Sequence, residues 1–261
     1  MLSYIYADIK EGAMAIFDRP EDEPVLKIFE EITRIPRYSG KEEMIGEYVC
    51  AHYNKDIHKI MRDDHGNILV SLPASKGYEN DKPIIIHSRL DMIYEQDSDS
   101  ERDLTKDGLD LIKAGDRLYA EGSSLGASSA VGLAMMISLM DDPSLVHPKL
   151  QLLFTARTYP EAEGAKKYDT SLLFSGRAAF ITLTGVKEGV FPYEGGSDAG
   201  EIISSMKKDA ESFGMDTDID PCIMGFDITD ADTPGEWVRI SSVTDMYHEV
   251  FVKLIAIRRA L

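Results

Sequence analysis

Short runs of apolar and β-branched residues alternate along this chain with longer segments of helical periodicity. Strands that alternate with helices are typical of an α/β fold with a largely parallel central sheet. The segment 127–140 is apolar on almost every side, which indicates a buried helix. We expect strands at 67–72, 83–87, 118–122 (an edge strand), 150–155, 178–183 and 222–226. We expect helices at 25–34, 42–53, 127–140, 170–174, 198–213 and 243–259.

The chain is strongly acidic, with 46 acidic against 28 basic residues and a formal net charge of −18. Nucleic acid and anionic membranes attract a positive surface, so neither is an expected partner. Two cysteines, Cys50 and Cys222, form no disulfide framework and no cysteine metal site. The first residues lack a signal-peptide pattern, and no apolar run is long enough to span a bilayer. These features together predict a cytoplasmic protein.

A proline-bounded acidic stretch near the N-terminus suggests a boundary. Pro20-Glu21-Asp22-Glu23-Pro24 interrupts any helix there. We therefore expect residues 1–24 to form an N-terminal extension and residues 25–261 to form a single domain. Shortly after this boundary, Ser39-Gly40-Lys41-Glu42 has the pattern of a capping box that opens the second helix.

Three segments carry the informative residues at predicted strand ends or helix starts. They are 84–92 (IIIHSRLDM), 125–133 (LGASSAVGL) and 152–163 (LLFTARTYPEAE). In open α/β sheets, ligands bind beyond the carboxyl ends of the strands, so a site is expected where these segments meet. The residues at their centres are Arg89, Ser128 and Tyr159. A divalent metal such as zinc prefers imidazole, thiolate or carboxylate ligands, and none of these three supplies one.

From about Val25 onward the chain resembles the aminoacyl-histidine dipeptidases, also called cytosolic non-specific dipeptidases. The stretches that carry the resemblance are VLKIFEEITRIPRYSGKEE, PASKGYEN and TPGEWVRISSV, together with the three segments above. The family belongs to the co-catalytic zinc peptidases. The resemblance implies a zinc-exopeptidase-like catalytic domain, with a mostly parallel sheet flanked by helices and a metal-dependent dipeptidase activity.

The resemblance also shows which residues stand at the family's functional positions. The metal-ligand positions fall on Arg89, Ser128, Tyr159, Thr184 and Asp232. The general-base position falls on Thr158, while Asp91 matches an aspartate that orients a ligating histidine. All five ligand positions and the base depart from the family pattern. Loss of a general base alone reduces rates by about 10²–10⁴-fold. We therefore expect no metal cofactor and a degenerate active site.

The resemblance also implies a lid domain inserted after the site strands, and we expect this chain to lack it. In this chain EGVFPYEGGSDAGEI (188–202) runs directly from one part of the scaffold to the next. These departures predict a truncated, catalytically degenerate homologue that acts as a binding or regulatory protein. Its partner would be a small ligand in the former cleft or a protein on the surface that faces the lid in the family. A purely structural partner of a full-length homologue is a further possibility.

The competing hypothesis is an active dipeptidase with a relocated zinc or other divalent metal site. Its ligands would come from His87, Asp91, Glu161, Glu163 and Asp232. Against it, a lone histidine such as His87 is more often a hydrogen-bonded core residue, and Glu161 and Glu163 fit a solvated loop. Ser128 is explained by N-capping of a helix. We also expect Arg89 and Arg157 to pair with Asp91 and Asp232 and so neutralise the pocket.

Overall fold

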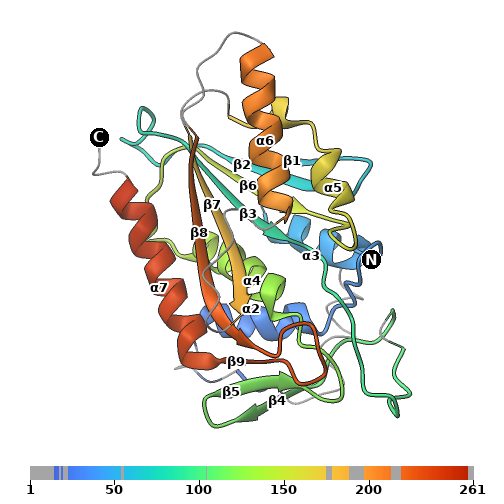
Figure 1. The fold of residues 1–261 in the computed structure, drawn as a ribbon. Helices are drawn as coiled ribbons and strands as arrows, with labels where there is room; N and C mark the ends of the chain where they lie inside the picture. The colour runs from blue at the N-terminus through green and yellow to red at the C-terminus, as the bar shows by residue number, and fades with distance from the viewer. Residues whose placement is uncertain are drawn as a thin grey trace.

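A single nine-stranded sheet organises the computed structural model (Figure 1). The structure describes residues 15–17, 19, 23–53, 56–103, 105–174, 178–187, 197–212 and 219–257. The strand order is β1-β2-β6-β3-β7-β8-β9-β5-β4. The strands are β1 (Lys59–Arg62), β2 (Ile68–Leu72), β3 (Ile84–Arg89), β4 (Leu111–Ala114), β5 (Arg117–Ala120), β6 (Leu150–Thr155), β7 (Ala178–Lys187), β8 (Ile219–Thr229) and β9 (Trp237–Arg239).

The centre of the sheet is parallel and its flanks are antiparallel. Strands β6, β3, β7 and β8 run in the same direction. On one flank, β2 pairs antiparallel with β6, and β1 pairs antiparallel with β2. On the other flank, each neighbouring pair in the series β8, β9, β5 and β4 is antiparallel. The predicted α/β fold with a mostly parallel core is therefore confirmed. The carboxyl ends of the central strands meet at one edge, which is where such sheets bind ligands.

Helices cover both faces of the sheet. They are α2 (Pro24–Thr33), α3 (Glu43–His52), α4 (Ala127–Asp141), α5 (Glu163–Lys166), α6 (Ser197–Ser212) and α7 (Ile240–Ile257), with a 3₁₀ turn η1 (Thr170–Leu172). Strand β3 shows how the core divides: Ile84 and Ile86 pack with α4 in the larger cluster, whereas Ile85 packs with α6 in the smaller one. This alternation follows from the two-residue period of a strand. Helix α4 lies against β3 and β7 and is buried along nearly its whole length, as predicted.

Several details correct the sequence predictions. Strand β5 is not an edge strand, because the unpredicted strand β4 lies outside it. Strands β1 and β9 were not predicted either. The proposed capping box is wrong: Glu42 precedes α3 without a side-chain cap, and the Ser39 hydroxyl bonds to the backbone of Tyr159 instead. Ser39 therefore contacts a residue distant in sequence in place of the expected capping contact at the start of α3.

The described residues near the N-terminus pack against the core. Phe17 packs in the larger core cluster, and the backbone N–H groups of Ile16 and Phe17 donate to the buried Glu30 carboxylate. The boundary at residue 24 stays a prediction. Within the described residues, no helix is both long and apolar enough to cross a bilayer.

The connection from β7 to α6 is short. Strand β7 ends at Lys187 and α6 begins at Ser197, so residues 188–196 form the whole link. Most of the stretch 188–202, on which the predicted loss of the lid depends, lies in this link, outside the described residues. A separate domain needs about 50 residues or more, so the sequence leaves no room for one here.

Candidate functional site

A pocket of about 180 Å³ lies at the carboxyl ends of β3, β7 and β8. Four of the five family metal-ligand positions line it: Arg89, Ser128, Thr184 and Asp232. The fifth, Tyr159, does not. The pocket is thus assembled from β3, the start of α4, β7, the start of α6, and the end of β8 with the loop after it. Of the three segments that were expected to meet, 84–92 and 125–133 contribute Arg89 and Ser128 to the pocket, whereas no residue of 152–163 lines it.

Arg89 contributes the positive charge of the pocket, and its contact is with Ser128. Its Nη2 donates to Ser128 Oγ at 2.7 Å. In the part of the chain that the structure describes, this is its single hydrogen bond, and it forms no ion pair there. The expected pairing with Asp91 or Asp232 is therefore wrong.

The N-capping role expected for Ser128 is also wrong. The N-cap residue of α4 is Gly126, in a left-handed conformation (φ 64°) and without a side-chain cap. Ser128 is the second residue of the helix, two positions after Gly126, and its hydroxyl accepts from Arg89. A guanidinium donor and a hydroxyl acceptor therefore meet at two positions that the resemblance assigns to metal ligands.

Beneath the pocket, one threonine hydroxyl joins two buried carboxylates. Thr158 Oγ1 lies 2.7 Å from Asp91 Oδ1 and 2.9 Å from Asp198 Oδ2. The Thr158 backbone N–H also donates to Asp91 Oδ2 at 2.9 Å. Burial raises the pKa of the Asp198 carboxyl, while Arg89 and the hydroxyls of Thr155 and Thr158 act in the opposite direction. Asp91 is thus held by the residue at the general-base position, and sequence reasoning did not find Asp198.

His87 is a core residue at the other end of this network. Its Nε2 lies 3.0 Å from Thr155 Oγ1, and that hydroxyl in turn donates to Asp198 Oδ2 at 2.7 Å. Burial, followed by the charge of Arg89, lowers the pKa of His87 to about 3. The side chain is therefore neutral at physiological pH. The interpretation of His87 as a hydrogen-bonded core histidine is confirmed.

Glu236, which the sequence did not indicate, holds the two sides of the pocket together. Its buried carboxylate accepts from the backbone N–H groups of Leu125 (3.2 Å), Gly126 (3.1 Å) and Ala127 (2.8 Å) at the start of α4. It also accepts from the N–H of Asp232 at 3.2 Å. The acceptor that satisfies the first turn of α4 is therefore 109 residues away in sequence from Ala127.

Arg37 also contacts the start of α4. It is fully buried and donates to the Gly126 carbonyl at 2.8 Å and to Ser129 Oγ at 2.7 Å. Burial lowers the pKa of its guanidinium to about 10, although Tyr94, Asp91 and Glu236 oppose the shift. Arg37 remains charged at neutral pH, and it is a structural cation outside the pocket lining.

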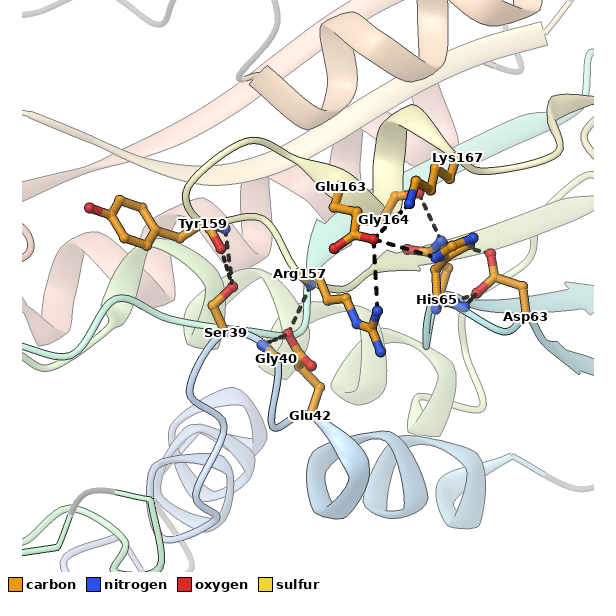
Figure 2. A network of polar contacts seen from close by, with 11 residues as sticks. Ser39, Gly40, Glu42, Asp63, His65, Arg157, Tyr159, Glu163, Gly164 and Lys167 are labelled. Carbon is orange, nitrogen blue, oxygen red and sulfur yellow. Dashed lines mark hydrogen bonds and ion pairs between the residues drawn. The ribbon is translucent and has the colours of Figure 1, made fainter.

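Three of the remaining residues, Arg157, Tyr159 and Glu163, belong to a partly exposed network of polar contacts (Figure 2). Tyr159 is 54% exposed and its ring points away from the other labelled side chains. Arg157 Nη1 lies 3.9 Å from Glu163 Oε1, which Lys167 Nζ contacts at 2.8 Å. Arg157 thus pairs with Glu163 and with neither Asp91 nor Asp232. Glu163 begins the short helix α5, so the expectation of a simple loop is wrong for it.

Comparison with known proteins gives related peptidases. No profile of a known protein family matches the chain. The cytosol non-specific dipeptidase of Escherichia coli (strain K12) is 34% identical over 143 residues, which cover 55% of this chain and 30% of that protein. The chain resembles the aminoacyl-histidine dipeptidases. It spans less than a third of the length of this curated dipeptidase.

Solved structures support the dipeptidase-like fold. The aminoacylhistidine dipeptidase of Vibrio alginolyticus matches with a TM-score of 0.61 and 24% identity over 67% of this chain and 35% of that one. The aminopeptidase PepT of Bacillus cereus ATCC 10987 matches with a TM-score of 0.66 and 11% identity over 90% of this chain and 98% of that one. At these identities the structural comparisons establish the fold alone.

The donor set of this dipeptidase-like pocket does not fit a divalent metal. The four family positions in it supply one guanidinium, two hydroxyls and one carboxylate, whereas zinc sites use at least three imidazole, thiolate or carboxylate ligands. Among the described residues, no three His, Cys, Asp or Glu side chains are grouped to hold a metal ion. The relocated set His87, Asp91, Glu161, Glu163 and Asp232 does not converge, because Glu163 belongs to the exposed network of Figure 2.

Proposed function

We propose that this chain is a catalytically degenerate relative of the metal-dependent dipeptidases that binds a small molecule in the pocket at its strand ends. The contact between Arg89 and Ser128 carries the proposal. It places a fixed cation and a neutral acceptor at two family ligand positions, joined to each other at 2.7 Å. A guanidinium there repels a divalent cation, so these two substitutions oppose metal binding more strongly than the loss of ligands alone.

The network below the pocket supports the same proposal. In a metal-dependent hydrolase, a general base must reach the metal-bound water. Thr158 has no basic group, and its hydroxyl is engaged by Asp91 and Asp198. These carboxylates are therefore occupied in hydrogen bonds of the scaffold. The pocket retains the position of a substrate site without the groups that would activate water.

We propose further that the protein acts in the cytoplasm. The name of the Escherichia coli relative places that protein in the cytosol. Cys50 and Cys222 are not in a disulfide, which fits a reducing compartment. Fractionation of the native host, with detection of the protein in the soluble fraction and in the membrane fraction, tests this location directly.

The test of catalytic loss is a hydrolysis assay on the purified chain. Dipeptides that include alanyl-histidine are incubated with added zinc or manganese, with and without a chelator. The matched variant is the double substitution Arg89→Met and Asp232→Asn. We expect the wild type and the variant to show the same background rate, unchanged by the chelator. Hydrolysis by the wild type that exceeds the variant and is abolished by the chelator would refute the proposal.

A further inference from the structure

The charges that line the pocket identify the kind of ligand it suits. Arg89 is half-buried there, and within the described residues one of its five N–H donors is engaged, by Ser128. A guanidinium with free donors in a partly buried site binds a carboxylate well, because the two planar groups can form paired hydrogen bonds. The pocket therefore offers a ready position for a ligand carboxylate.

The acidic side of the pocket requires a second charge on that ligand. Asp198 and Asp232 also line the pocket. Two carboxylates against one guanidinium leave it with a net negative charge when all three are ionised. A simple anion would bind Arg89 but meet the repulsion of both aspartates. A ligand that carries an ammonium group beside its carboxylate satisfies both sides.

Asp232 is held in place for such a contact. Its backbone has a φ of 62°, in the left-handed region, and its N–H donates to the Glu236 carboxylate at 3.2 Å. The same carboxylate binds the first N–H groups of α4, the helix that carries Ser128. Glu236 therefore fixes the position of the Asp232 backbone relative to the start of that helix. Arg89 and Asp232 therefore contribute opposite charges to the lining of one pocket.

The size and walls of the pocket limit the rest of the ligand. Its volume of about 180 Å³ is below the range of about 300–1,000 Å³ that is typical of sites for drug-sized molecules. The lining also includes four apolar side chains, Leu183, Ala199, Ile228 and Ala231, beside polar ones such as Ser88 and Thr182. A single small apolar group fits these walls.

We propose that the pocket binds one free α-amino acid with a small apolar side chain, its carboxylate on Arg89 and its ammonium on Asp232. This inference rests on the proposed function, since it names the ligand of the same pocket. It requires no bond to be formed or broken.

Isothermal titration of the full chain with close ligand analogues tests this inference. L-Alanine and L-valine are the probes, propionate lacks the ammonium group, and ethylamine lacks the carboxylate. A hydrogen-bonded charge contributes about 1.5–3 kcal/mol, so each analogue should bind about 10- to 100-fold more weakly than alanine. Propionate or the dipeptide alanyl-alanine binding as tightly as alanine would overturn the inference, as would no binding of either amino acid.

Matched variants locate the binding site. Arg89→Met and Asp232→Asn should each weaken alanine binding about 10-fold or more, whereas Arg157→Met and Asp227→Asn, outside the pocket lining, should leave it unchanged. Unchanged affinity in both pocket variants would overturn the assignment. The analogue series uses the wild type alone, so it decides the matter even if a variant fails to fold. Failure here leaves the hydrolysis result untouched, so the two proposals fail separately.

Discussion

Thr158→Val is the substitution that most sharply tests the buried network under the pocket. It removes one hydroxyl and keeps the branched shape of the side chain. That hydroxyl contacts Asp91 at 2.7 Å and Asp198 at 2.9 Å. A hydrogen bond to a charged group contributes about 1.5–3 kcal/mol. Since one hydrogen serves both carboxylates, we count one such bond and part of a second, and expect the free energy of unfolding to fall by about 2–4 kcal/mol.

Urea denaturation followed by circular dichroism measures this loss, and Thr33→Val is the matched control. Thr33 is also buried, but its hydroxyl donates to the neutral backbone carbonyl of Glu30 at 2.9 Å. An ordinary hydrogen bond contributes about 0.5–1.5 kcal/mol, so the control should lose less. A loss in Thr158→Val no greater than that in Thr33→Val would refute the reasoning.

The same variant has a predicted pH dependence. The Thr158 hydroxyl lowers the pKa of Asp198, so its removal lets burial raise that pKa further. A carboxyl whose pKa is raised on folding stabilises the protein at low pH, and this stabilisation is lost as the pH rises through the raised pKa. The cost of Thr158→Val should therefore be larger at about pH 7 than at about pH 4. A cost that decreases over this range would contradict the network.

Three further variants test other parts of the site by urea denaturation. Glu236→Ala leaves several N–H groups of the α4 start without their acceptor and should cost about 3 kcal/mol, whereas exposed Glu249→Ala should change stability by less than about 0.5 kcal/mol; equal effects would contradict the role of Glu236. Asp198→Asn cannot ionise, so its stability relative to the wild type should increase as the pH rises, because burial raises the pKa of Asp198; a constant difference would count against this. Gly132→Ala places a methyl group against Ser88 Oγ where α4 meets β3 and should cost about 1–3 kcal/mol; a neutral effect would show that the helix can move away.

The central strands could be predicted because their signals are local. Ile84, Ile85 and Ile86 form an uninterrupted β-branched run, and such a run suits a strand buried on both faces. Strand β4 has two half-buried and two exposed residues, and β9 has only three residues. Neither segment therefore shows a hydrophobic pattern that distinguishes it from a loop. Their pairing depends on partners distant in sequence, which no local pattern reveals.

The sequence predicted where the site lies, but it did not predict which residues form hydrogen bonds there. The resemblance indicated Arg89, Ser128, Thr184 and Asp232, and the structure brings these four together. It could not indicate Glu236, which is buried through backbone contacts with α4, a helix more than 100 residues earlier. Asp198 was missed for a similar reason, since it enters from the first turn of α6. The partners expected for the arginines were wrong because nearer acceptors were available.

Zinc binding by the purified chain is the measurement that tests the central claim most directly. Equilibrium dialysis against micromolar zinc, followed by elemental analysis, gives the number of equivalents bound by the wild type and by Asp232→Ala. Because Arg89 and Ser128 contact each other at positions that the resemblance assigns to metal ligands, we predict no stoichiometric zinc and no difference between the two proteins. One or more equivalents in the wild type that Asp232→Ala abolishes would contradict the account.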